Sequence, residues 1–214
     1  MKYVLSFIMC LSLSLVLLLT SLDYYSGNEK FYKNFQNRND IAKEAGLSVE
    51  ALNTVNSDLI QYLKTGENNL LEKHFNTREI THMEDVFKLF ELGRTVRIAL
   101  VVIAALLIAF SIYRYGAEST FKTSSITMLF VWGLGAVLAL LILSDFSESF
   151  IKFHHIFFDN DLWLLNPETD MMIRMLPQNF FMEMVYKILM GFVTALASVH
   201  ILFFVIFNVI KKRG

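Results

Sequence analysis

Four long runs without a charged residue constrain this chain more than any other feature of its sequence. They are Tyr3–Leu22, Ile98–Tyr113, Thr123–Ser144 and Ile188–Ile210. About 20 apolar residues in a helix cross the hydrocarbon core of a bilayer, which is roughly 30 Å thick. The second run is shorter, but Arg97 and Arg114 flank it, and their aliphatic stems can extend its apolar length. Since a backbone in lipid must satisfy its own hydrogen bonds, each run predicts a transmembrane helix.

The composition agrees with an integral membrane protein. Hydrophobic residues make up 55% of the 214, and the mean hydropathy is +0.47, which places the chain outside the range of ordinary soluble domains. The single cysteine, Cys10, lies inside the first apolar run, so an internal disulfide is impossible and redox chemistry is not expected. The net charge is −1, and we expect neither a cofactor nor a nucleic-acid partner.

The distribution of charge predicts the orientation in the membrane. Both tails and the short connection between the second and third runs carry six basic residues against the single acidic residue Glu118; the six are Lys2, Arg114, Lys122, Lys211, Lys212 and Arg213. The other two connections hold ten basic residues against nineteen acidic ones. Basic residues favour the cytoplasmic side, so both termini are expected inside and both long connections outside.

These observations predict an all-α integral membrane protein with four transmembrane helices. An extracytoplasmic helical cap is built from the connections between helices 1 and 2 and between helices 3 and 4. The predicted transmembrane helices cover residues 1–22, 94–114, 123–144 and 187–210. The extracytoplasmic segments cover 23–93 and 145–186, the cytoplasmic loop 115–122 and the cytoplasmic tail 211–214.

The first outer segment contains signals for short helices. Gly46 can end one helix and Ser48 can cap the next, which should stop near Lys64-Thr65-Gly66. Further on, Thr81 and Glu84 have the spacing of a capping box, which predicts a helix beginning at Thr81.

The predicted helix start would put His82 in the first helical turn. The positive end of the helix dipole lowers the pKa of an imidazole there and favours its neutral, basic form. Gly93 offers a bend that would lay residues 82–92 along the membrane surface.

The segment after the third apolar run concentrates aromatic and titratable side chains. As a helix, Phe146, Phe150, Phe153 and Phe157 would form one stripe, with His154 at its edge and His155 pointing away. Such a helix should lie flat at the lipid–water boundary. One interpretation is an aromatic anchor with incidental histidines; the other is a site shared with His82, which has an equivalent position. Asn166-Pro167 then predicts another helix start.

Two further histidines receive other interpretations. His200 lies deep in the last apolar run, where an ionisable residue is a functional candidate by default. Its depth separates it from the other histidines, so we expect an interhelical hydrogen bond. His74 is expected to be a solvated loop residue.

The two histidine motifs together resemble a known family. The resemblance lies in Arg78-Glu79-Ile80-Thr81-His82-Met83-x-Asp85-Val86 and Phe153-His154-x-Ile156-Phe157-Phe158, followed by Trp163, Asn166-Pro167, Asp170 and Pro177-x-x-Phe180-Phe181. This pattern, over essentially the whole chain, is similar to that of the bacterial lipoprotein intramolecular transacylases (Lit). The doubled His154-His155 leaves two candidates for the second histidine, and both the motif and the helical phase select His154.

The resemblance implies an acyltransferase in the bacterial plasma membrane that needs no external acyl donor. Its substrate would be a lipoprotein whose N-terminal cysteine carries a diacylglyceryl group. The acyl chain on the middle glyceryl carbon would move to the cysteine α-amine and leave the lyso form. The active site is then expected at the outer leaflet.

The resemblance also suggests roles for individual residues. His82 would be the general base and His154 its partner and oxyanion donor, or the two roles could be exchanged. Asp85, Asn160, Trp163 and Asp170 would bind substrate or support the pair, and an Asp beside a catalytic imidazole can fix its tautomer.

Two other classes remain open at this stage. A membrane metallohydrolase could use His82, His154, His155 and either Asp85 or Asp159 as ligands, although the tight spacing of known zinc motifs is missing. A non-enzymatic membrane sensor or assembly factor could use paired histidines as pH-responsive anchors.

Overall fold

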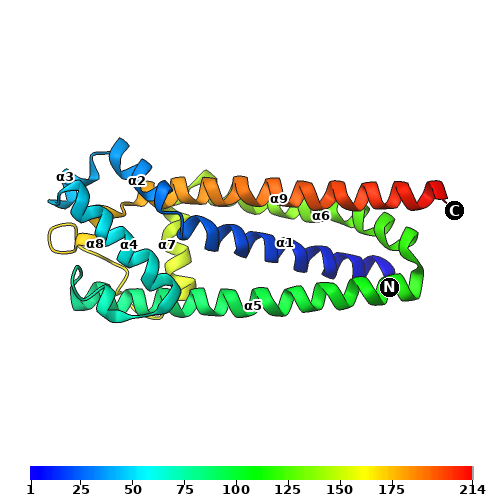
Figure 1. Cartoon of the computed structure of the whole chain (residues 1–214), viewed down its shortest axis with the longest axis horizontal. Coiled ribbons are helices and arrows are strands. Elements are labelled where there is room, and N and C mark those ends of the chain that lie inside the picture. Colours follow the sequence, from blue (N-terminus) through cyan, green and yellow to red (C-terminus); the bar gives the residue numbers. More distant parts are fainter. Residues whose placement is uncertain (214) are drawn as a thin grey trace. The chain divides into compact units, whose positions relative to one another are not determined.

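The computed structural model describes residues 1–213, and all the regular elements in this part of the chain are helices (Figure 1). In chain order they are α1 (Lys2–Ser26), α2 (Glu29–Arg38), α3 (Ile41–Ala45), α4 (Val49–Thr65), the short 3-10 helix η1 (Asn68–Leu70), α5 (Thr77–Tyr115), α6 (Ala117–Ser144), α7 (Phe146–Phe157), α8 (Met171–Met175) and α9 (Gln178–Arg213). The predicted all-α class is thereby confirmed.

The chain divides into two compact units. Unit 1 contains residues 1–22, 93–144 and 188–214, and unit 2 contains 23–92 and 145–187. The two connections expected to build an outer cap therefore fold into one unit.

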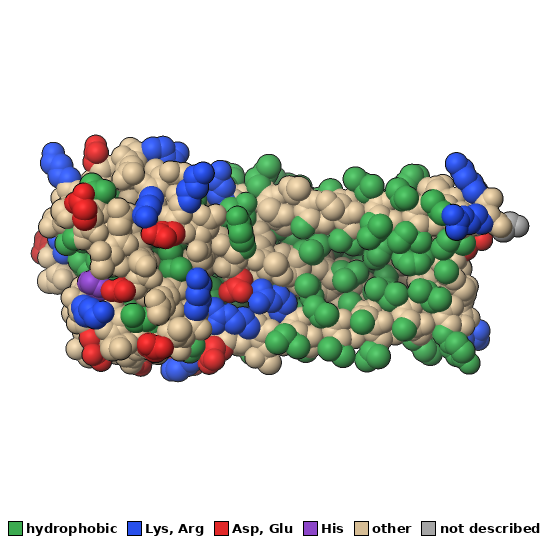
Figure 2. Space-filling model, in the orientation of Figure 1, with side chains coloured by type: hydrophobic (Ala, Val, Ile, Leu, Met, Phe, Trp, Pro, Cys, Tyr) green, Lys and Arg blue, Asp and Glu red, His purple; other side chains and the backbone are tan. Residues whose placement is uncertain are grey.

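Four helices are long and apolar enough to cross a membrane, namely α1, α5, α6 and α9. Within the most apolar stretch of each helix, few residues are buried inside the protein: 33% in α1, 11% in α5, and 17% in both α6 and α9. Apolar side chains therefore cover much of the outward surface of unit 1 (Figure 2). Water would solvate such a surface poorly, whereas hydrocarbon suits it. The protein is accordingly an integral membrane protein with four apolar helices.

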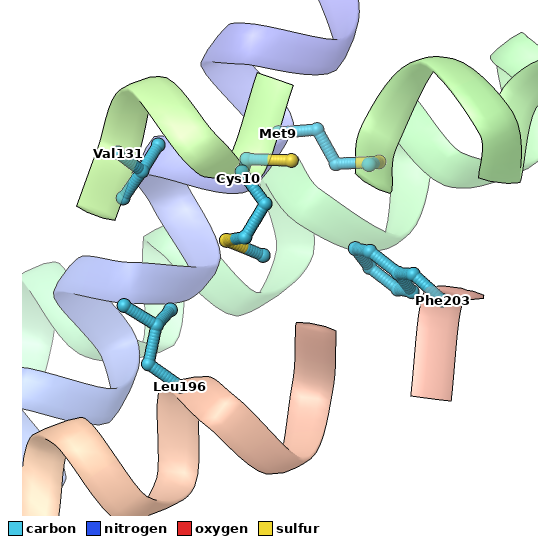
Figure 3. Packing of buried hydrophobic residues seen from close by; sticks show 6 residues of the cluster. Met9, Cys10, Val131, Leu196 and Phe203 are labelled. Carbon is cyan, nitrogen blue, oxygen red and sulfur yellow. The ribbon is translucent and has the colours of Figure 1, made fainter. Parts of the chain in front are cut away.

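A small cluster of side chains forms the core of unit 1. It joins Met9 and Cys10 of α1 to side chains of α6 and α9; these are Met128, Val131, Leu196 and Phe203 (Figure 3). The Cys10 thiol donates to the carbonyl oxygen of Ser124 at 3.5 Å and lies 3.5 Å from the Thr127 hydroxyl. Small polar residues on α6 thus let α1 approach closely, as in many transmembrane helix pairs.

His200 makes the interhelical contacts predicted for it. The indole N–H of Trp132 on α6 donates to His200 Nδ1 at 3.3 Å, and Ser125 Oγ lies 3.2 Å from His200 Nε2. Both ring nitrogens therefore have partners, so this imidazole links α6 to α9.

Unit 2 packs around aromatic rings. Phe180 at the start of α9 is fully buried, and its ring centroid lies 4.9–5.2 Å from those of Phe31, Tyr32 and Phe35 of α2. This packing brings residues 145–187 against residues 23–92 within unit 2.

Glycine and serine end and begin the short helices of unit 2 as predicted. Gly46 and Gly66 follow α3 and α4 in the left-handed conformation, with φ of 71° and 72°, and Ser48 accepts a hydrogen bond from Ala51 N. The prediction for the Asn166-Pro167 pair was wrong: residues 166–170 form a turn, and α8 begins at Met171. The carbonyl of Asn166 accepts from Thr169 N and Asp170 N, which closes that turn.

His74 was also predicted incorrectly. Its Nε2 lies 2.8 Å from Asp58 Oδ2, and the imidazole side chain is only 16% exposed. A pairing between a loop histidine and a carboxylate on α4 depends on the tertiary fold, and the local sequence carries no sign of it.

Gly66 and Gly46 form a matched pair for testing this packing. A Cβ at Gly66 would lie 2.6 Å from Phe87 Cε1, whereas a Cβ at Gly46 meets nothing within 4 Å. The Phe87 ring packs against buried Tyr62, so it cannot move away freely. Gly46→Ala should cost only the left-handed backbone strain, about 1–2 kcal/mol. Gly66→Ala should cost this and about 1–3 kcal/mol more from overpacking.

The measurement is the thermal melting of both variants in detergent beside the parent protein. Equal losses of stability in the two variants would contradict the close approach of Phe87 to Gly66.

Candidate active site

The helix that carries His82 begins one turn earlier than predicted. The Asn76 side-chain oxygen accepts from Glu79 N at 3.1 Å, and Glu79 Oε2 accepts from Asn76 N at 2.9 Å. This reciprocal pair is a capping box, so α5 begins at Thr77 and the Thr81 hydroxyl merely donates to the carbonyl of Thr77. The expected helix start at Thr81 is therefore wrong, and His82 lies in the second turn. The helix also continues through Gly93, which does not interrupt it.

Glu79 connects the start of α5 to the start of α8. Its side chain is 1% exposed, and its second oxygen accepts from Met172 N at 2.6 Å. Burial raises the pKa of Glu79, while the backbone hydrogen bonds oppose that rise. One carboxylate thus satisfies free backbone donors at the ends of two helices.

Asp170 makes the neighbouring connection. Its carboxylate accepts from Asn166 N, from the Thr169 hydroxyl and from the Asn76 amide, at 2.7–2.9 Å. Burial raises the pKa of Asp170, but these hydrogen bonds outweigh that effect and the net pKa lies below its ordinary value. The bonds from Asn166 and Thr169 hold the turn before α8, and the bond from Asn76 ties this turn to the start of α5.

His154 is the one buried residue of α7. Its exposed fraction is 7%, whereas Phe153, Ile156 and Phe157 are 46%, 74% and 50% exposed. The side of α7 that the protein covers is therefore centred on His154, whereas Phe153 and Phe157 of the predicted stripe are half-exposed. His155 is exposed, as the helical phase predicted. Sequence periodicity located the apolar stripe on α7 but not which side of the helix the protein covers.

The two histidines approach each other in the interior of unit 2. The centroids of the His82 and His154 rings are 6.1 Å apart, with an angle of 31° between their planes. Phe158 packs against both rings, with centroid distances of 5.2 Å to His82 and 5.6 Å to His154. The contact joins α5 to α7, whose positions differ by more than 70 residues in the sequence.

Trp163 completes the cluster. Its indole stacks on the His154 imidazole at a centroid distance of 4.6 Å and an interplanar angle of 27°. The connection that carries Trp163 is held by Arg78 on α5, whose guanidinium donates to the carbonyls of Asp161 and Leu164. The same helix thus presents His82 and anchors the loop that presents the indole.

The hydrogen bonds of the pair are incomplete. His154 Nδ1 lies 2.6 Å from the carbonyl oxygen of Phe150, so a proton on Nδ1 is donated to that carbonyl. The neutral ring then carries its free electron pair on Nε2. In contrast, His82 Nδ1 and the indole N–H of Trp163 are buried, and neither has a hydrogen-bond partner in the part of the chain that the structure describes. Unpaired buried polar groups are rare in proteins because each costs free energy, and they often occur at functional sites.

Burial keeps both imidazoles neutral. The pKa of His82 is lowered to about 4: desolvation is the largest cause, the nearby His154 adds to it, and Asp85 acts in the opposite direction. For His154, burial lowers the pKa while the hydrogen bond to the Phe150 carbonyl raises it. The helix dipole was expected to lower the pKa of His82; the direction is right, but the main cause is burial.

Asp85 does not hydrogen-bond to His82. Its carboxylate accepts from Lys88 Nζ at 2.9 Å and from the Asn160 amide at 3.0 Å. The hydrogen bond from Lys88 is the main reason that the pKa of Asp85 lies below its usual value. Asp85 and Asn160 are therefore in contact with each other, and together they hold α5 to the loop before Trp163.

Of the six residues predicted for the site, three are linked by ring contacts: His154 packs against both His82 and Trp163. No role was predicted for the Phe150 carbonyl, Phe158, Arg78 or Glu79. Phe158, Arg78 and Glu79 nevertheless belong to the two histidine motifs. Among residues 1–213, no three His, Cys, Asp or Glu side chains are arranged as a set of metal ligands. The metallohydrolase alternative therefore lacks a visible ligand set in the part of the chain that the structure describes.

Four apolar helices and a buried pair of neutral imidazoles define an integral membrane protein with a candidate site for acid–base chemistry. A family model described as lipoprotein intramolecular transacylase Lit matches residues 7–181. The chain therefore belongs to the Lit family of lipoprotein intramolecular transacylases, which confirms the resemblance noted in the sequence.

Solved structures show the same fold. The in meso structure of the transacylase Lit from Bacillus cereus is 23% identical, with a TM-score of 0.83, and the match covers 100% of this chain and 98% of the other. Two variants of that protein, in which one histidine is replaced by arginine or by alanine, are each 24% identical with a TM-score of 0.80. The match covers all of this chain in both cases, and 94% and 96% of the respective variants. No curated protein sequence matches the chain.

The lowered pKa of His82 predicts a pH dependence of stability. Between pH 6.5 and 4 the unfolded chain binds a proton at this residue and the folded chain does not, so stability is lost as the pH falls through that range. The full effect of His82 should be at most about 3 kcal/mol. In His82→Asn, which cannot titrate, the melting temperature should fall less between pH 7 and pH 4.5. Parallel curves for the parent and the variant would contradict a neutral, buried His82.

Proposed function

We propose that this transacylase moves the acyl chain from the middle glyceryl carbon of a diacylglyceryl-cysteine lipoprotein to the α-amine of the same cysteine. The product would be an N-acyl lipoprotein with one chain left on the glyceryl group. The observation that carries the proposal is the buried pair His82 and His154 beside Trp163, with two N–H-bearing side chains that lack partners. Family membership supports the reaction class.

The reaction sets two demands on the protein. The amine and the ester belong to one molecule, but the tetrahedral intermediate would close a roughly eight-membered ring, so the protein must hold a conformation close to attack. The α-amine has a pKa of about 8 and must lose a proton to attack. The departing glyceryl oxygen must gain a proton when the C–O bond breaks. One base can carry out both transfers, with a typical effect of about 10²–10⁴-fold.

His154 suits the role of general base better than His82. The Phe150 carbonyl orients the His154 ring through Nδ1, which leaves Nε2 to take the proton from the amine and return it to the glyceryl oxygen. The same hydrogen bond stabilises the imidazolium, so it offsets part of the effect of burial on the pKa. His82, with a pKa near 4, would be a weak base at neutral pH. These facts favour His154 as the general base and His82 as the oxyanion donor, which is the second of the two assignments that the sequence left open.

His82 and Trp163 then suit the oxyanion. A neutral imidazole can donate an N–H to a developing negative charge without being protonated itself. The unpartnered groups are His82 Nδ1 and Trp163 Nε1, and donors that are already in place need little reorganisation in the transition state. The tautomer of His82 that bears the proton on Nδ1 is the one required.

The surroundings of the pair suit a lipid substrate. Phe150, Phe153 and Phe158 pack against the His154 ring, which limits access of water that would hydrolyse the ester. The next residues along α7, Ile156 and Phe157, are exposed and offer an apolar surface to acyl chains or to the bilayer.

The charge distribution supports an outer site. The six basic residues at the tails and in the α5–α6 connection favour cytoplasmic termini, so residues 23–93 and 145–186 would lie outside as a helical cap. The site would then open to the outer leaflet, where mature lipoproteins of the bacterial cell membrane are anchored.

The first test of this function is a reaction without an acyl donor. Purified protein in detergent should convert a diacylglyceryl lipopeptide to an isomer of the same mass, because the ester bond breaks as the amide bond forms. Tandem mass spectrometry locates the acyl chain on the amine. A strict requirement for added phospholipid or acyl-CoA would exclude the intramolecular reaction.

The second test uses the histidines as one unit. His82→Ala and His154→Ala should each remove most of the rate, and the double variant should be little slower than either, because the two rings serve one transition state. His155→Ala is the matched control: that ring is exposed and meets the site only through an edge contact with Trp163, at a centroid distance of 5.2 Å, so the rate should change far less. Initial rates on the lipopeptide are measured with a melting curve for each variant, because both buried histidines also contribute to packing.

Amide substitutions separate the two roles. His82→Asn keeps an N–H donor near the position of Nδ1, so it should recover part of the rate lost in His82→Ala. His154→Gln has no basic nitrogen and should be as slow as His154→Ala. The opposite pattern would return the role of base to His82. A membrane sensor without enzymatic activity would tolerate all four changes.

A further inference from the structure

A cleft of about 580 Å³ lies within unit 1, at the connection between α5 and α6. Lys2 of α1, Lys122 of α6 and Ile210 of α9 line it together with residues 115–119. Its volume falls in the range of pockets that bind small molecules or headgroups. In Figure 1 the N-terminus lies beside this connection. The proposed acyl transfer uses no residue of this cleft.

The start of α6 offers free backbone donors to the cleft. Gly116, between the two helices, has a φ of 78°, a conformation that favours glycine. The first intrahelical bond is donated by Thr120 N to the Gly116 carbonyl at 3.1 Å, so the N–H groups of residues 117–119 have no acceptor inside the helix. Glycine has no side chain to cap them. The uncapped end of a 28-residue helix attracts anions.

The side chains around this helix end add positive charge and a further donor. Lys2 and Lys122 line the cleft against one carboxylate, Glu118, and neither lysine forms an ion pair within residues 1–213. The Tyr115 hydroxyl is buried and has no hydrogen-bond partner among residues 1–213. Its ring is held by the Arg114 guanidinium, 5.6 Å from the ring centroid. An unpartnered phenol, two ammonium groups and free N–H groups thus surround one cavity.

We propose that this cleft binds the phosphate of an anionic phospholipid headgroup. The phosphate oxygens would accept from the α6 amides, from Tyr115 and from the two lysines. Glu118 would accept from a hydroxyl of the headgroup glycerol. Ile210 and the apolar outer surfaces of the helices would contact the acyl chains. The lipid would thereby connect α1, α9 and the α5–α6 connection, and raise the stability of unit 1.

The binding does not depend on the proposed reaction. With the termini in the cytoplasm, as proposed, the lipid would lie in the cytoplasmic leaflet, and only this placement rests on the proposed topology. Acyl transfer to the lipopeptide in lipid-free detergent should be the same for Lys122→Gln and for the parent protein. A failure of the lipid site and a failure of the proposed function therefore give different results.

The experiment titrates the delipidated full chain in detergent with dioleoyl phosphatidylglycerol and follows the melting temperature. Phosphatidylglycerol should raise it, and phosphatidylcholine at the same concentration should not. Lys122→Gln should weaken the apparent affinity about fivefold, the value expected for one basic residue near an anionic lipid. Lys212→Gln in the tail removes the same charge outside the cleft and should change the affinity less than twofold.

Tyr115→Phe distinguishes lipid binding by the Tyr115 hydroxyl from a purely structural role of this residue. The hydroxyl has no protein partner, so its removal should leave the melting temperature without lipid unchanged or higher, while the affinity for phosphatidylglycerol falls. Equal weakening by Lys212→Gln and Lys122→Gln would overturn the site in favour of general charge attraction. The last titration uses inorganic phosphate alone. If it raises the melting temperature as much as phosphatidylglycerol does, the ligand is free phosphate and the proposal of a lipid site is overturned.

Discussion

The buried carboxylate of Glu79 is the interaction on which the arrangement of the candidate site depends. It accepts from the backbone at the start of α5 and from Met172 N at the start of α8. One ionisable group thus fixes the helix that carries His82 against the segment that follows Trp163. A buried carboxylate without such partners would be very costly, so the two helix ends and the acid depend on each other. Asp170, Asn76 and Arg78 then set the course of the loop between them.

Much of this fold can be predicted from the sequence, because the lipid imposes strict local rules. Uncharged runs of 20 residues have few alternatives to a helix, and Gly46, Ser48 and Gly66 mark helix ends through conformations that few other residues adopt as well. The start of α5 was misjudged because Asn76–Glu79 and Thr81–Glu84 have the same spacing. Two tertiary hydrogen bonds favour the first, from Met172 N to Glu79 and from the Asn76 amide to Asp170. The pairing of His74 with Asp58 could not be predicted for a similar reason.

The candidate site was predictable in its members more than in its geometry. Motif resemblance selected His82, His154 and Trp163, which the fold brings together. It also suggested Asp85 as the residue that orients a histidine. The orienting group at His154 is instead a backbone carbonyl, that of Phe150, one helical turn earlier. A carbonyl belongs to every residue and leaves no mark in a sequence, whereas an aspartate does. Reasoning from residue types therefore assigns to side chains a role that the backbone can fill.

Burial affects the two imidazoles differently because their hydrogen bonds differ. His154 has an acceptor for Nδ1, so its protonated form keeps some stabilisation in the interior. His82 Nδ1 has none, and its pKa falls to about 4. Burial that makes His82 a poor base also makes it a better donor, since its N–H has no competing water and lies where the dielectric constant is low. In the proposed reaction, the free energy lost in the unpaired donors of the resting protein would be regained when they donate to the developing negative charge, which would favour the transition state over the bound ester.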